Sequence, residues 1–169
     1  MLAVFVGNDV DENFRKTVCS ILQKQVKALE ISGDKLVFSG FDAHGLVCVF
    51  SKNLKEIRAD GSIVLLNNCA GSIQISGERC CVLDGRNRSD LTLAQKSGGE
   101  VITCGLSTRD TLTFSSYTEE NCVVSLQRRL RRLDGGYAEP FELPFECQKS
   151  DDRYAILCAS LILILLGII

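Results

Sequence analysis

The chain has 169 residues, of which 46% are hydrophobic and 24% are charged, and its formal net charge is −2. This length is enough for one domain with a sizeable core and favours one domain over two. A net charge this small provides no large electrostatic field, so it gives no argument for nucleic acid or an anionic membrane surface as a partner.

Nine cysteines are many for a chain of this length. Most lie in apolar runs such as LVCVF, VITCGL and AILCAS, where free cysteine acts as a small core residue. No CxxC spacing is present, so we predict no metal site, and no other cofactor is indicated. Reduced thiols indicate a cytoplasmic location, and the first residues lack the basic leader of a signal peptide. The alternative is a redox-sensing pair, for which Cys80 and Cys81 are the candidates.

The N-terminal stretch is predicted to form a strand followed by a helix. Residues 2–6 are a short apolar run that ends at Gly7, as a buried strand leaving through a turn does. Asp11 can cap a helix, and apolar side chains then recur at helical spacing from Phe14 to Leu29. A β-α opening is typical of a parallel sheet.

Residues 35–53 contain two β-rich runs around the sequence GFDAHG, and they form either a hairpin or two neighbouring strands. Within this sequence, Asp42 and His44 stand two positions apart between glycines. Such a pair can act as a general acid and base, which gives the hypothesis of a small enzyme. An ordinary turn has the same composition, and we favour it because glycine and aspartate are common in turns for backbone reasons.

The middle of the chain is predicted to form a β-α-β unit over residues 80–105. The run GSIVLLNN gives a strand before this unit, CCVLDG gives its first strand and EVITCGL its second. Between the last two, Ser89 is expected to cap a short helix that ends at Gly98. Crossovers of this kind are right-handed and join parallel strands.

The loop DGRNRSD is the best candidate for a ligand site. After a strand and before a helix N-terminus it places four polar residues, Asp84, Arg86, Asn87 and Arg88. Ligands of open α/β sheets bind at this edge, and a helix N-terminus favours anions. We therefore predict a small anionic ligand, such as a uridine nucleotide or another phosphate-bearing molecule. The alternative is a solvated loop.

After Gly105 the pattern becomes antiparallel. The runs TLTFSSY and CVVSLQRRLRRL have strand composition, DGG is a hairpin turn signal, and the proline-interrupted segment YAEPFELPFE is predicted at an edge. The four arginines of QRRLRRL are explained by an edge strand whose charged side chains prevent pairing with another chain. No aromatic residues interleave with them, so we predict no nucleic-acid binding.

The C-terminal tail leaves two possibilities open. From Tyr154 to Ile169 it has no charged residue, and Asp151 or Asp152 can cap a helix there. A helix that is apolar all round is either buried in the core or inserted in a membrane. The tail is short for a bilayer core, which needs roughly 20 residues. An exposed helix would indicate a membrane anchor, and a buried helix would indicate a core element.

From residue 60 to residue 169, the order of these elements resembles the second half of the central domain of Mur ligases. The matching residues are Val82 to Asp84 for the family's VLNADDP-like strand end, Val101 to Leu106 for its VITFGL-like strand, and the run from Ser150 through Leu161 for its HNxxNALAA-like helix start. Mur ligases join amino acids to the peptidoglycan precursor with ATP. The resemblance implies a bacterial cell-wall connection and a tail helix packed on the sheet.

The catalytic parts of that family have no counterpart in the sequence. No phosphate loop of the GxxxxGKS or GxxxxGKT type is present, although glycines follow strands in VFVGND and NNCAGS. The HN of the family's helix start falls on Ser150 and Asp151, and its later Asn falls on Tyr154. The family's glutamate and histidine ligands for magnesium have no match. The resemblance therefore implies a shortened relative without the ligase machinery.

Together these patterns predict one α/β domain over residues 1–169, with a mainly parallel sheet, flanking helices, an antiparallel β extension and an apolar C-terminal helix. The leading hypothesis is a non-catalytic, Mur-ligase-like cytoplasmic protein that binds a protein partner or a small anionic ligand. The alternative is a tail-anchored membrane protein with a cytoplasmic α/β head. The sequence indicates no oligomeric state.

Overall fold

The computed structural model describes residues 1–26, 28–32, 46–69, 73–77 and 79–169. Asp42 and His44 lie outside the described residues, as does most of the segment predicted as a hairpin or two strands around them. The hypothesis of an acid–base pair therefore stays a prediction.

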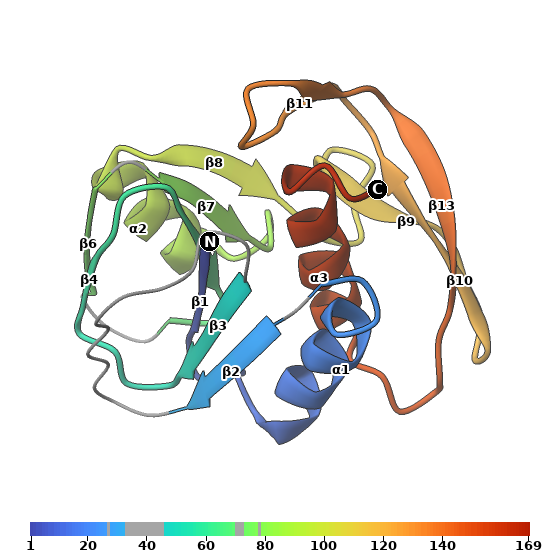
Figure 1. Cartoon of the computed structure of the whole chain (residues 1–169), viewed down its shortest axis with the longest axis horizontal. Helices are drawn as coiled ribbons and strands as arrows, with labels where there is room; N and C mark the ends of the chain where they lie inside the picture. Colours follow the sequence, from blue (N-terminus) through green and yellow to red (C-terminus); the bar gives the residue numbers. More distant parts are fainter. Residues whose placement is uncertain (27, 33–45, 70–72, 78) are drawn as a thin grey trace.

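A six-stranded parallel sheet forms one half of the molecule (Figure 1), and its order is β2-β3-β1-β5-β7-β8. β3 and β5 are buried along their whole length and β1 along nearly all of it, as expected when layers cover both faces of a sheet. The chain visits β2 and β3 on one side of β1 before it returns to β5 on the other side, so the direction of winding reverses next to β1. The strands are β1 (Leu2–Val6), β2 (Ala28–Ser32), β3 (Leu46–Ser51), β5 (Ser62–Leu66), β7 (Arg79–Leu83) and β8 (Glu100–Thr103).

Helices α1 (Glu12–Leu22) and α3 (Arg153–Leu165) cover one face of this sheet and pack against each other (Figure 1). α1 begins where the Asp11 carboxylate accepts a hydrogen bond from the backbone N–H of Phe14 at 2.8 Å, so the predicted cap is confirmed. The Phe14 ring meets the Phe5 ring of β1 edge to face, with 5.9 Å between their centroids.

The apolar tail forms a core helix. Residues 155–165 of α3 are all buried, because this helix lies between the parallel sheet and a second sheet (Figure 1). At its start, the Asp152 carboxylate accepts from the N–H of Ala155 at 2.8 Å, and the Tyr154 hydroxyl donates to the carbonyl of Leu66 at 3.0 Å. A helix that is apolar all round thus has apolar neighbours on all sides, which agrees with the core element and not with an exposed anchor.

No helix in the described part of the chain is long and apolar enough to cross a lipid bilayer.

The second sheet is antiparallel and contains β9 (Leu112–Tyr117), β10 (Asn121–Leu126) and β13 (Phe141–Glu146) in the order β13-β10-β9. A small hairpin of β11 (Leu130–Arg131) and β12 (Tyr137–Ala138) is inserted between β10 and β13. The predicted turn at residues 134–136 is therefore confirmed. The long strand expected over CVVSLQRRLRRL is wrong in extent, because β10 ends at Leu126, two of the arginines precede the hairpin and the other two lie within it.

The opposite face of the parallel sheet carries helix α2 (Arg88–Ser97) and two short parallel strands, β4 (Glu56–Arg58) and β6 (Gln74–Ser76). α2 connects β7 to β8, so the predicted β-α-β unit is confirmed. Its cap is Asn87 and not Ser89, because the Asn87 side chain accepts from the N–H groups of Ser89 and Asp90. Gly98 ends the helix in the left-handed conformation, as predicted.

None of the nine cysteines forms a disulfide in the described part of the chain, and seven of them are buried. Cys80 and Cys81 are neighbours on β7 and therefore point to opposite faces of the sheet, where they belong to two different apolar clusters. This arrangement does not bring the two thiols together as a redox pair.

Candidate functional site

Four loops meet at the carboxyl edge of the parallel sheet, where β1, β3, β5 and β7 end. Parallel strands place all their carboxyl ends at one edge, and ligands of open α/β sheets bind there, next to the point where the winding reverses. This edge is therefore the first place to look for a site.

The loops after β1 and β5 are joined through their backbones. The N–H of Asn67 donates to the carbonyl of Val6 at 2.9 Å, and the N–H of Asn8 donates to the carbonyl of Asn68 at 3.1 Å. A Cβ atom at Gly7 would lie only 1.8 Å from the Asn67 carbonyl oxygen, and Gly7 has a φ of +141°. The glycine in VFVGND is thus required for the close approach of two chain segments.

A buried carboxylate holds the loop after β5 in place. Asp90, on the first turn of α2, is 1% exposed and accepts hydrogen bonds from the backbone N–H groups of Asn68 and Cys69, each at 2.9 Å. Asn68 has a φ of +59°, a left-handed conformation that asparagine tolerates better than most residues. The sequence predicted no role for Asp90, because its two partners lie in a different loop.

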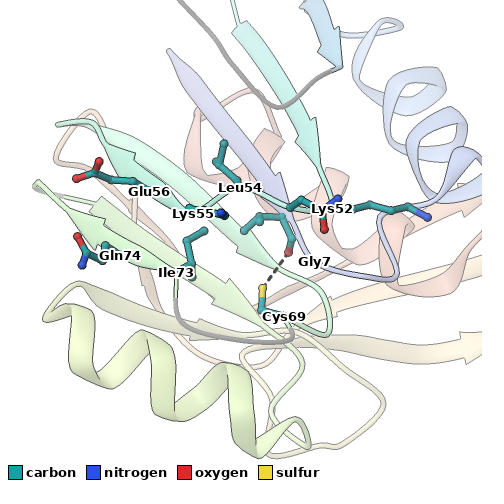
Figure 2. Close-up of a pocket in the computed structure, with 10 residues that line it drawn as sticks. Gly7, Lys52, Leu54, Lys55, Glu56, Cys69, Ile73 and Gln74 are labelled. Carbon is teal, nitrogen blue, oxygen red and sulfur yellow. Dashed lines mark hydrogen bonds between the residues drawn. The ribbon is translucent and has the colours of Figure 1, made fainter.

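A cleft of about 540 Å³ opens at this edge, between the layer of β4 and β6 and the ends of β1 and β3 (Figure 2). The residues that line it are Val6, Gly7, Lys52, Asn53, Leu54, Lys55, Glu56, Cys69, Ile73 and Gln74. Its size lies within the range of small-molecule sites, which is roughly 300–1,000 Å³. Lys52 and Lys55, close behind a buried strand, are the signal for this cleft in the sequence, and sequence reasoning missed it.

The charge of the cleft comes mainly from Lys55. Figure 2 shows its ammonium group among the other lining residues, whereas the Lys52 side chain extends away from them. Neither lysine forms an ion pair with a described residue, while Glu56 is paired with Arg58 at 2.6 Å. The cleft therefore offers a cation without a partner in the described part of the chain, which suits an anion.

The thiol in the cleft is not a nucleophile. Burial, and then the negative charge of Asp90, raise the pKa of Cys69 to about 12. The protonated Sγ donates to the carbonyl oxygen of Val6 at 3.2 Å (Figure 2). Because the reactive form of cysteine is the thiolate, this group serves as a structural donor at neutral pH.

The predicted ligand loop lies at the same edge but does not line the cleft. Arg86 is paired with Asp84 through two hydrogen bonds, from Nε at 3.1 Å and from Nη2 at 2.8 Å. The Asn87 side chain is the cap of α2, and Arg88 is exposed without an ion pair to a described residue. The side chains of Arg86 and Asn87 thus form hydrogen bonds within their own loop and the start of α2. Their binding of a ligand stays a prediction.

A second buried carboxylate explains the glycines of DGRNRSD and EVITCGL. Asp110 is 3% exposed and accepts from the N–H of Ser107 at 3.1 Å. A Cβ atom at Gly85 or Gly105 would lie 2.3 Å or 2.6 Å from its carboxylate oxygens. Both glycines are therefore needed to leave room for this side chain.

Within the described residues, no three acidic, histidine or cysteine side chains are grouped to hold a metal ion.

Comparisons with known proteins find structures with a similar fold. No protein-family model matches the chain, and no curated protein matches it in sequence. Two solved structures are similar in fold, with a TM-score of 0.56 each: MurF from Acinetobacter baumannii at 7% identity, and MurF ligase from Thermotoga maritima in complex with ADP at 6% identity. The similarity covers 98% and 99% of this chain but only 42% and 45% of those proteins. The resemblance to Mur ligases is thus confirmed as a likeness of fold, and it extends beyond residues 60–169 to nearly the whole chain.

Proposed function

We propose that the protein is a non-catalytic, Mur-ligase-like binding protein that holds a small anionic ligand in the cleft at the carboxyl edge of its parallel sheet. The observation that carries the proposal is the cleft itself, which lies where the winding of the sheet reverses and contains the ammonium group of Lys55. A phosphate-bearing molecule has the charge and the size that such a cleft accepts.

The absence of catalytic parts from the sequence supports binding without turnover. The loop between β1 and α1 reads GNDVD and has neither a lysine nor the glycine spacing that cradles phosphates. The Cys69 thiol stays protonated at neutral pH, so the cleft offers no thiolate nucleophile. The chain spans less than half the length of the MurF proteins that it resembles in fold. From this likeness of fold we extend the proposal to a link with cell-wall metabolism. Nine cysteines without a disulfide in the described structure favour a cytoplasmic location for this binding protein.

The test is thermal unfolding with ADP, with uridine diphosphate and with inorganic pyrophosphate, each at millimolar concentration. A ligand at ten times its Kd stabilises the folded state by about 1.4 kcal/mol, or roughly 3–5 °C in Tm for a chain of this size. We expect such a rise for at least one of these probes.

Three matched substitutions locate the ligand. Lys55→Gln should abolish the rise in Tm, whereas Lys96→Gln, the same change on the exposed side of α2, should leave it unchanged. Arg88→Gln tests the loop predicted from the sequence. Loss of the rise in Arg88→Gln and not in Lys55→Gln would move the ligand to that loop. No rise with any of the three probes would contradict the proposal.

A further inference from the structure

A second surface, distant from the cleft, combines arginines with exposed apolar side chains. It consists of the β11–β12 hairpin and the last turn of the chain, and we call it the arginine hairpin surface. Of the five large hydrophobic side chains exposed in the described part of the chain, three belong to it: Leu133 at 38%, Tyr137 at 50% and Ile168 at 39%. Arg131 and Arg132 lie on the same hairpin, within a chain whose net charge is −2.

Backbone contacts hold the apolar residues of this surface together. The N–H of Leu133 donates to the carbonyl of Leu165, at the end of α3, at 3.0 Å. The N–H of Ile168 donates to the carbonyl of Leu163, also at 3.0 Å. In Figure 1 the hairpin accordingly reaches over the C-terminal end of α3. The apolar tail thus comes to the surface only by its last turn, next to the hairpin.

The arginines within the hairpin and directly before it differ in how they are paired. Arg129 lies over the Tyr137 ring at 3.8 Å and is paired with Glu139 at 3.0 Å, and Arg132 is paired with Asp134 at 3.0 Å. Those two ion pairs are neutral. Arg128 donates to the carbonyl of Arg109, and Arg131 is exposed without an ion pair to a described residue. One positive charge of this surface, that of Arg131, therefore remains available, and Arg131 lines the same hollow as the exposed Leu133 side chain.

A hollow of about 270 Å³ lies between the hairpin and the amino edge of the parallel sheet. Arg131, Arg132 and Leu133 line it on the side of the hairpin, and Ser62 and Glu100 line it on the side of the sheet. The hollow has room for a phosphate group, with two arginines on one wall. Glu100 is the opposing charge, and it should weaken the binding of an anion.

We propose that the arginine hairpin surface docks on an anionic lipid membrane, with a lipid phosphate in the hollow beside Arg131. At the boundary between headgroups and acyl chains, a membrane offers phosphates to arginines and an apolar layer to leucine and isoleucine, and tyrosine is enriched at this depth. The phosphates of a nucleic acid can also pair with the arginines, but a nucleic acid offers no apolar layer for Leu133 and Ile168. The docking is peripheral and needs no membrane-spanning helix.

The test is co-sedimentation of the full chain with vesicles in about 0.1 M NaCl. Vesicles of phosphatidylglycerol and phosphatidylcholine in a ratio of about 1 to 3 should bind the protein, and vesicles of phosphatidylcholine alone should not. One basic residue near an anionic surface contributes a factor on the order of five in affinity, so Arg131→Glu, which changes the charge by two units, should weaken binding on the order of 20-fold. Leu133→Ser should weaken it several-fold, and Glu100→Gln should strengthen it.

Lys96→Glu is the control, because it makes the same change of charge at an exposed position on α2, which covers the opposite face of the parallel sheet from α3 (Figure 1). Circular dichroism checks that each variant is folded. Equal loss of binding in Lys96→Glu and Arg131→Glu would overturn the proposal, as would no binding of the folded wild-type protein to the anionic vesicles. A 20-nucleotide single strand or a polyglutamate peptide that binds as tightly, with the same ranking of variants, would overturn the assignment to lipid.

Discussion

The two faces of the parallel sheet are built differently. On one face, α1, α3 and the antiparallel sheet enclose a large apolar cluster in which α3 is buried all round. On the other face, α2 and the short strands β4 and β6 cover a smaller cluster, and the cleft opens beside them. We infer that the first face supplies most of the free energy of folding. The second face has a smaller apolar cluster, and this leaves space for the cleft at the carboxyl edge.

Substitutions in the two clusters test this difference most strongly. Leu161→Ala removes a fully buried side chain from α3, and we expect a loss of about 3–5 kcal/mol in the free energy of unfolding. Ile57→Ala, on β4 in the smaller cluster, should cost about 2 kcal/mol, because the thin layer can collapse around the missing atoms. Urea unfolding measures both values. Equal losses would remove the distinction between the faces.

The junction of the loops after β1 and β5 should be the most sensitive point of the thinner face. In Gly7→Ala the new Cβ atom meets a backbone carbonyl, which cannot rotate away, so we expect a loss of about 3 kcal/mol. Gly98 also has a positive φ, of +74°, but open space around it, and Gly98→Ala should cost about 1 kcal/mol. A similar Tm for the two variants would show that strain, and not the close approach of two loops, determines the effect.

The next effect in size concerns the carboxylate that joins α2 to the loop after β5. Asp90→Asn replaces one acceptor oxygen by an amide donor, so one of the two backbone N–H groups loses its partner, and we expect a loss of about 2 kcal/mol. Asp9→Asn is the control, because Asp9 is exposed and its carboxylate accepts only from the Asn68 side chain in the described structure. That change should cost less than about 0.5 kcal/mol. Comparable losses in urea unfolding would mean that burial does not set the value of these hydrogen bonds.

Local signals predicted most of the architecture. The run LAVFV, the cap Asp11 and the glycine at position 98 each act within a few residues, and the structure confirms the elements that they predict. The helical spacing expected as far as Leu29 is wrong in extent, because α1 ends at Leu22 and Leu29 lies on β2. Two three-residue strands, EIR and QIS, were missed, because three residues do not establish a period.

The parts of the site that were missed depend on contacts between distant segments. Asp90 and Asn68 are 22 positions apart, and the sequence does not show that their loops meet. The same holds for Gly7 and Asn67, and for the cleft that these loops border. The arginines of QRRLRRL were attributed to a guarded edge strand, because the sequence does not show that Tyr137 folds back under Arg129.

The smallest expected effect is on the loop that the sequence favoured as a ligand site. Burial alone raises the pKa of Asp84, but the hydrogen bonds and the charge of Arg86 outweigh it, so the pKa lies below its usual value. A carboxyl whose pKa is lowered by folding stabilises the folded state above its unfolded pKa, near 4, and this contribution is lost as the pH falls. Because Arg86 is largely exposed, the contribution should be only about 0.5 kcal/mol.

Arg86→Gln should therefore flatten the decline in stability between about pH 5 and pH 3, while Arg88→Gln, which breaks no ion pair with a described residue, should not. Urea unfolding at several pH values measures the slope. If Arg86→Gln changes the slope and leaves the rise of Tm with phosphate-bearing probes intact, Arg86 serves to hold its own loop, and the ligand belongs to the cleft. If it abolishes the rise of Tm, the exposed loop takes part in binding, and the carboxyl edge acts as one site from β3 to β7.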